Sequence, residues 1–534
     1  MSLITTLARL EAARSGRAQP LATVRHRHLS HRPLVLVPLT TAGEAGAPLG
    51  ALVGTDRDSP RLLTVPQPRD RELRFAFLAE LAGTVLPYLD SCADDVEPAE
   101  RTETDPETGK RVTVEVELCR DAPQIVVPSR AGVAYVRLLG RSTRFRRTAE
   151  QDPDTPYPAP PHIPLLGRWL THYGERARVP GSSLLLSATD LLGRHWATGQ
   201  SNLEDQHLGA LLAWIDPPEG RSGAEAALRA ENGRDAAGQL VCPPAGPATD
   251  PAFDNALLAP AIDAYDLARQ RLAAAEDGGA ADERLGELAA AERRIRELLA
   301  AQLRPTWDAV WQALDVMRRL PEGVRAGERW TRDRWSYTSH RDRVRAGEPP
   351  QPRRDSAVGA AQKLASRETE QARLEAQEAL DDPLAMAARR LAGEAFTSEV
   401  VAVEMSWSEG RRPSPRPLVT VTTDDLPQLG GGEKVYRSLE GKAQAAEFVG
   451  RADGGRLVLR VVNGMGRGKE PAPGTVPEAG DRICWTLFEH EPRGGARLPD
   501  PEETPWTHGG PPDAAPDGVV LAERPDPVTS EDLL

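Results

Sequence analysis

Val400-Val401-Ala402-Val403-Glu404-Met405-Ser406-Trp407 is the stretch at which the apolar pattern of this chain changes, and it decides the fold class. It opens a series of short apolar segments with a period of two, the spacing of strands that bury one face. Leu418–Thr422, Arg456–Val462 and Ile483–Phe488 continue the series, and Asp453-Gly454 is a strong hairpin signal. Five or six short strands within residues 396–489 predict a small β-barrel of SH3-like or OB-like type.

The chain before this barrel has a helical period instead. Apolar residues recur on one helical face along residues 285–317 and again, more sparsely, from about Val358 to Leu380. We therefore expect a long antiparallel helical hairpin across residues 224–393. The segment 329–345 would lie between its arms, near the bend.

The N-terminal part mixes strand and helix patterns. Residues 1–32 predict a helix followed by a basic connector, and residues 33–150 predict an α/β domain. The expected strands of this domain are Pro33–Leu39, Ala51–Gly54, Arg61–Val65, Val112–Leu118 and Gln124–Val127. An acidic insertion, residues 94–107, separates the expected helix Asp70–Leu89 from the last two strands and is predicted to be structureless.

Prolines mark the next expected boundary. Six prolines stand between Pro153 and Pro164, which excludes a helix there, so residues 165–218 are predicted to form a separate, compact domain that contains tryptophans. Residues 490–534 are rich in Pro, Gly and acid and are predicted to be a disordered acidic tail. The predicted fold class is thus a multidomain α+β protein with a helical hairpin and a C-terminal barrel.

The candidate functional segment is Arg329 to Arg345, where six arginines face two aspartates, a local charge of +4 in a chain whose net charge is −13. Two tryptophans and a tyrosine lie among these arginines. Arginines can hold phosphates while aromatic rings stack on bases, so the segment predicts contact with nucleic acid. The candidate residues are Arg329, Trp330, Arg332, Arg334, Trp335, Tyr337, Arg341, Arg343 and Arg345. In the alternative interpretation the tryptophans pack in a helical core and the arginines pair with acids; exposure of Trp330 and Trp335 decides between the two.

Composition limits this argument. Only five of the 66 basic residues are lysine, which is typical of the coding bias of a GC-rich genome, so arginine abundance by itself predicts nothing. The clustering of the arginines carries the hypothesis. An acidic pI of about 5.4 also argues against a protein that coats DNA in general. A second cluster, around Phe145, consists of Arg137, Arg141, Arg144, Arg146 and Arg147.

Signals for catalysis are weak. Asp190, His195, Glu204 and His207 combine histidine with carboxylate and could form a hydrolase site if the fold brings them together. Gly464 to Lys469 lacks the first glycine of a phosphate-binding loop, and Glu470 replaces the magnesium-binding hydroxyl residue. We therefore expect no ATPase activity, no cofactor and no metal, and more generally no enzyme.

The layout of about residues 284–489, a helical stalk followed by a small barrel, resembles the stalk and 1B barrel of superfamily 1 helicases. The motor motifs of that family are absent here. The resemblance implies an accessory protein that contacts nucleic acid and works beside a separate helicase-type ATPase. An interaction scaffold that does not bind nucleic acid is the alternative, and the hydrolase built on His195 and His207 is the second alternative.

The sequence also predicts a compartment. We find no apolar run of membrane-spanning length, and the N-terminus does not have the pattern of a signal peptide. The four cysteines lie far apart and predict free thiols. A cytoplasmic protein without a membrane partner is therefore expected.

Overall fold

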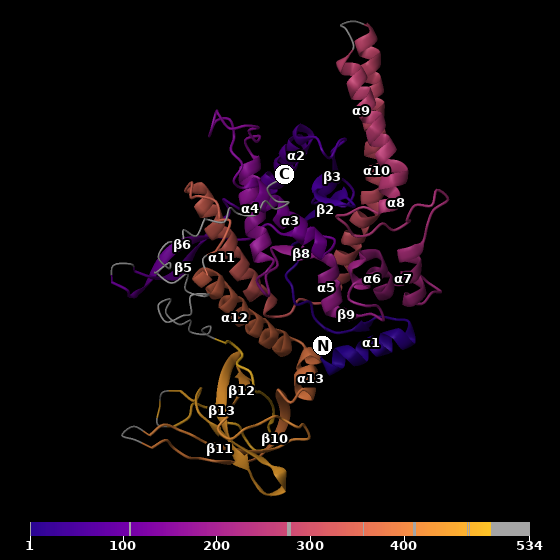
Figure 1. Cartoon of the computed structure of the whole chain (residues 1–534). Helices are drawn as coiled ribbons and strands as arrows, with labels where there is room; N and C mark the ends of the chain where they lie inside the picture. Colours follow the sequence, from indigo (N-terminus) through magenta and orange to yellow (C-terminus); the bar gives the residue numbers. More distant parts are fainter. Residues whose placement is uncertain are drawn as a thin grey trace, which may run out of the picture.

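A five-stranded mixed sheet organises the N-terminal half of the chain (Figure 1). The computed structural model describes residues 2–105, 108–274, 279–355, 357–409, 413–466, 468 and 470–492. The strands are β2 Leu34–Thr41, β3 Glu44–Gly54, β4 Arg61–Thr64, β7 Ile125–Val127 and β8 Leu185–Ser187, in the order β4-β3-β2-β7-β8. β2, β3 and β4 are antiparallel neighbours, while β7 and β8 run parallel to β2.

The central strand β2 is an unbroken apolar run because both of its faces are covered. Leu34 and Leu36 point into one hydrophobic core, and Val35 and Val37 point into a second core on the opposite face. The first face carries α2 Arg71–Asp90, α3 Arg130–Thr143 and α4 Ile163–Arg176. The second carries α5 Ala188–His195, α6 Leu208–Ile215, α9 Ala259–Ala273 and α10 Gly279–Arg318.

The proline-rich segment does not separate two domains. The strand β8 pairs with β7, and α4 packs closely against α3, so residues 165–218 complete the same sheet and its two cores. The prolines only prevent a continuous helix between α3 and α4. A parallel strand far along the chain leaves no local signal of which sheet it joins, which is why the sequence suggested a boundary here.

The acidic insertion is also structured. Residues Val96–Thr104 form β5, which pairs antiparallel with β6, Arg111–Cys119, along its whole length. The expected neighbour of β6, the strand at residues 124–127, belongs to the five-stranded sheet instead. This two-stranded ribbon can contain many charged residues because most of its side chains face solvent.

The two helices of the hairpin are not the pair that the sequence predicted, which were residues 285–317 and about 358–380. Helices α9 and α10 pack side by side and project from the molecule in Figure 1. The segment 329–345 is not a bend, because it lies within the helix α11, Ala326–Arg345, which is followed by α12, Ala357–Asp381, and α13, Pro383–Leu391. One buried stripe anchors this helix to the rest of the protein. It consists of residues that recur at helical spacing: Ala326, Trp330, Asp333, Tyr337 and Arg341.

A closed six-stranded barrel follows α13, as predicted for residues 396–489 (Figure 1). The strands are β10 Ala395–Glu404, β11 Leu418–Thr422, β12 Lys434–Leu439, β13 Lys442–Arg451, β14 Leu457–Val461 and β15 Arg482–Thr486, in the order β10-β11-β14-β13-β12-β15. Phe396 and Trp485 are fully buried at its centre. The multidomain α+β class is confirmed. The predicted tail is described only as far as residue 492, and the rest lies outside the described residues.

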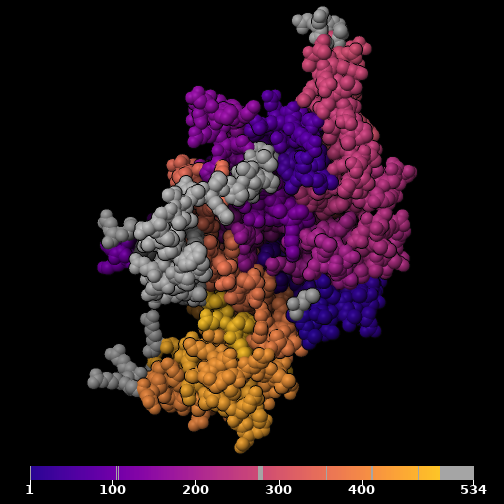
Figure 2. All heavy atoms as spheres, viewed as in Figure 1, coloured from indigo at the N-terminus to yellow at the C-terminus, as the bar shows by residue number. Residues whose placement is uncertain are grey.

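The remaining elements connect these parts. They are α1 Leu3–Ser15, β1 Gln19–Pro20, β9 Trp196–Ala197, η1 Glu204–Gln206, α7 Gly223–Asn232, α8 Pro251–Phe253, η2 Asp254–Leu258 and η3 Asp453–Gly455. The space-filling view in Figure 2 shows the barrel as a distinct lobe below the sheet domain. None of the helices in the described ranges has both the length and the apolar character that crossing a membrane requires.

Candidate nucleic-acid interface

The aromatic residues of α11 fasten this helix to the sheet domain. Trp330 is 7% exposed, its Nε1 donates to Asp121 at 2.9 Å, and its ring stacks on His28 at 4.3 Å between centroids. Tyr337 is fully buried, and its ring stacks on Trp169. Trp330 and Tyr337 are therefore not free to stack on bases in this conformation. Trp335 is half-buried.

Most arginines of α11 are already engaged. Arg329 and Arg341 are buried and donate to acceptors of neighbouring elements. Arg332 pairs with Glu370, Arg334 with Glu97, and Arg345 with Asp94. Burial lowers the pKa values of Arg329 and Arg332, while nearby glutamates oppose this effect. Arg343 differs: it is exposed and forms no ion pair with the part of the chain that the structure describes.

The fold brings the second basic cluster close to this helix. The buried Arg144 donates to the carbonyls of Gln351 and Pro352, at 3.0 and 3.3 Å, and so fixes the loop after α11. Arg144 and Arg353 then lie over the ring of Phe145, at 4.6 and 5.3 Å from its centroid. The aromatic ring of the second cluster is thus flanked by arginines from two segments.

Arg168 of α4 connects the two groups. Gln351 donates to its carbonyl, and Arg343 of α11 lies close enough to oppose its charge. Burial, with this repulsion, lowers the pKa of Arg168, while Glu348 acts in the opposite direction. We call Phe145, Arg168, Arg343 and Arg353 the basic surface. It joins one residue from each sequence cluster, Arg343 and Phe145, with Arg168 and Arg353, which no local pattern singles out.

The histidine and carboxylate candidates do not form a catalytic site. His195 is fully buried, its Nδ1 lies 2.7 Å from the carbonyl of Leu191, and its Nε2 accepts from the amide of His26. His207 caps α6 through Nδ1, and Glu204 caps its own turn through Ser201. Asp190 pairs with Arg130. Each group has a local structural partner, and within the described ranges no three His, Cys, Asp or Glu side chains are placed to hold a metal ion.

The sequence pattern also missed a buried carboxylate on α11. Asp333 is fully buried and accepts hydrogen bonds from Arg176, from the Ser182 hydroxyl and from the Ser183 amide, at 2.7, 2.7 and 2.6 Å. It fixes the loop between α4 and β8 to α11. A carboxylate among arginines suggests a local ion pair, so the sequence contains no sign that the partners of Asp333 lie about 150 residues earlier.

Comparison of the chain with protein-family models, with curated proteins and with solved structures finds no match in any of the three.

Proposed function

We propose that this chain is a non-catalytic accessory protein that contacts nucleic acid through its basic surface. The observation that carries the proposal is the arrangement of arginines from three segments: Arg353 lies over the ring of Phe145, and Arg168 lies close enough to Arg343 for their charges to repel. Gln351, two residues before Arg353, donates to the carbonyl of Arg168 and so connects the two groups. Arginines hold the phosphate backbone, and the ring of Phe145 accepts one unpaired base once the exposed Arg353 moves from over the ring to a phosphate, so the expected ligand is a single strand. A helicase-type ATPase that supplies this strand is part of the proposal.

The proposed interface excludes most of α11. Of the nine residues that the sequence selected, Arg343 is the one that contributes to the basic surface. The buried aromatic rings and paired arginines of the same helix give it a structural role. Binding to the phosphate backbone therefore dominates the expected affinity, and sequence preference should be weak.

Fluorescence anisotropy with a labelled single-stranded oligonucleotide tests the proposal. The double variant Arg343→Gln and Arg353→Gln should bind about a hundredfold more weakly, since each substitution removes a charge-assisted hydrogen bond to a phosphate and costs about tenfold. The slope of log affinity against log salt should also become less steep, by about 0.7 for each phosphate that the variant no longer neutralises.

Arg345→Gln is the matched control, because Arg345 lies on the same helix and is also exposed, but pairs with Asp94. It should leave the affinity nearly unchanged. Equal decreases in affinity for the control and for the double variant, or binding that does not respond to salt, would contradict the proposed surface.

The alternative is a protein-interaction scaffold that binds no nucleic acid. The observation that favours it is the burial of Trp330, one of the two tryptophans whose exposure separates the two hypotheses; the other, Trp335, is half-buried. The same titration distinguishes them, because a scaffold of this kind shows no salt-dependent binding to any oligonucleotide.

A further inference from the structure

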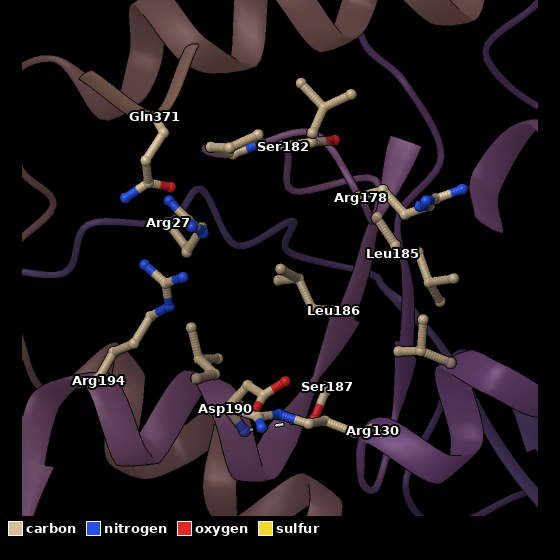
Figure 3. A pocket seen from close by; sticks show the side chains of 15 residues that line it. Arg27, Arg130, Arg178, Ser182, Leu185, Leu186, Ser187, Asp190, Arg194 and Gln371 are labelled. Atoms are coloured by element: carbon tan, nitrogen blue, oxygen red, sulfur yellow. Dashed lines mark hydrogen bonds and ion pairs between the residues drawn. The ribbon is translucent and has the colours of Figure 1, made fainter. Parts of the chain in front are cut away.

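A small cavity of about 290 Å³ lies beside β8, the edge strand of the five-stranded sheet (Figure 3). Its walls come from the N-terminal connector, α3, the loop between α4 and β8, α5 and α12. The polar side chains that line it are Arg27, Arg130, Arg178, Ser182, Ser187, Asp190, Arg194 and Gln371. Neither the sequence pattern nor the proposed function accounts for this gathering of arginines.

Arg27 is the central group. Its residue is 7% exposed, and one of its nitrogens, Nη1, donates to the carbonyl of His26 at 3.4 Å. Its nearest carboxylate oxygen, Oε1 of Glu378, is 4.0 Å away, which is too far for a hydrogen bond. Within the described part of the chain its other N–H groups have no acceptor. These donors open onto the cavity rather than into the protein interior, so a group bound in the cavity can accept from them.

A second arginine faces the first. Figure 3 shows the polar ends of Arg27, Arg194 and Gln371 directed toward one another at one side of the cavity. Arg194 lies 3.7 Å from the same Glu378 oxygen, so one carboxylate at long range serves two guanidinium groups. Burial, followed by repulsion from Arg194, lowers the pKa of Arg27 to about 9. The cavity therefore has an excess of positive charge.

The other charged groups do not cancel this excess. Arg130 and Asp190 form a hydrogen-bonded pair at 2.5 Å and balance each other. Arg178 lines the cavity and is 3.6 Å from Glu175, again beyond hydrogen-bond distance. The lining contains Asp190 as its one acidic side chain and no aromatic ring. The chemistry is that of a receptor for a compact anion rather than for a base or an apolar molecule.

We propose that the side of the cavity where Arg27 and Arg194 face each other binds a dianionic phosphate group, either free or at the end of a larger molecule. Two facing guanidinium groups present planar forks of donors that match a tetrahedral oxyanion with several oxygens. Gln371 is not counted as a donor, because its Nε2 already donates to Glu375 at 2.8 Å. The anion would take up the donors of Arg27 that the protein leaves unused. This site is separate from the basic surface and does not depend on the proposed function.

Calorimetric titration of the full chain with inorganic phosphate, in a chloride buffer of low ionic strength, tests the site. One phosphate should bind per chain, and Arg194→Gln should weaken it by about tenfold or more, as expected when a charge-assisted hydrogen bond is removed. Arg194 is half-exposed at the side chain, so this variant should fold. Arg27→Gln should have at least as large an effect.

Arg319→Gln serves as the control, because Arg319 is exposed and pairs with Asp216 far from the cavity. It should bind phosphate as the unchanged chain does. No measurable binding of phosphate, or equal affinity in Arg194→Gln and Arg319→Gln, would overturn the site even if Arg27→Gln does not fold.

Three further ligands, an oligonucleotide with and without a 5′-phosphate and adenosine monophosphate, identify the source of the phosphate. A 5′-phosphorylated oligonucleotide that binds more tightly than its 5′-hydroxyl form, with the difference abolished in Arg194→Gln, assigns the site to strand ends. Binding of inorganic phosphate and adenosine monophosphate without such a difference assigns it to a small phosphorylated molecule. Binding of the oligonucleotides without any binding of phosphate supports the basic surface and rejects this cavity.

Discussion

At the scale of single residues, two buried histidines couple the stability of this protein to pH. His172 and His340 stack at 4.2 Å between ring centroids. Burial lowers the pKa of His340 to about 3, with repulsion from Arg343 and Arg168. Burial also lowers the pKa of His172, with repulsion from His340 and nearby arginines. Both rings are neutral in the folded chain and gain a proton on unfolding below their ordinary pKa of 6.5. The two neutral histidines contribute fully to the free energy of unfolding above that pH, and this contribution declines progressively as the pH falls toward 3.

His340→Phe tests this coupling, because phenylalanine keeps an aromatic ring against His172 but cannot take a proton. Between pH 6 and 4 its free energy of unfolding should fall less steeply than that of the unchanged chain, by about 1.4 kcal/mol per pH unit. Urea unfolding at several pH values measures the slopes. His31→Phe, at an exposed position, should leave the slope as it was; an unchanged slope in His340→Phe would count against the argument.

At the scale of elements, α11 shows how a charged segment can be a core helix. Its buried stripe includes Arg329, Asp333 and Arg341, so the helical period cannot be read from apolar residues. Each of these charges is satisfied by a group distant in the sequence, such as Gln377 for Arg329 and Ser183 for Asp333. The helix therefore depends on its surroundings more than on its own propensity.

Alanine substitutions on this helix should separate its core side from its outer side. Trp330→Ala removes a buried indole and the hydrogen bond to Asp121, and should lower the free energy of unfolding by about 3–5 kcal/mol. Trp335→Ala removes the same side chain from a half-buried position and should cost about 1 kcal/mol. Equilibrium urea unfolding of both variants provides the comparison. Decreases of equal size would mean that Trp330 does not anchor the helix.

At the scale of the whole molecule, a single carboxylate ties the N-terminal connector to the helix that leads into the barrel. Asp382 caps α13 by accepting from Leu384 at 2.9 Å. It also accepts from the backbone and hydroxyl of Thr23, at 2.8 and 3.0 Å, and lies 3.2 Å from His26 Nε2. Thr23 and His26 stand about 356–359 residues earlier in the chain, so the connector and the barrel helix are held together at one point.

Asp382→Ala should therefore lower the free energy of unfolding by more than the removal of an ordinary helix cap does. We expect a decrease of about 3 kcal/mol in the free energy of unfolding, since a cap and buried hydrogen bonds disappear together. Asp70→Ala is the matched variant, because Asp70 caps α2 from a more exposed position; with the loss of its partly exposed ion pair to Arg269 it should cost about 1–2 kcal/mol. Chemical denaturation followed by tryptophan fluorescence measures both. Similar costs for the two caps would show that the hydrogen bonds between the connector and α13 contribute little.

The sequence by itself determined the period of most segments, and hence four of the five strands of the sheet, the amphipathic helices and the barrel, because period depends on local chain geometry. It also identified both basic clusters. Only the tertiary structure decided that α9, rather than α12, is the partner of α10, and that β8 joins the first sheet. The tertiary structure also buried Trp330, brought Arg168 close to Arg343, placed Arg353 over Phe145, and left Arg27 facing Arg194. These outcomes depend on pairings between residues far apart in the chain, and the energy of a charge depends on what surrounds it, which no local pattern encodes.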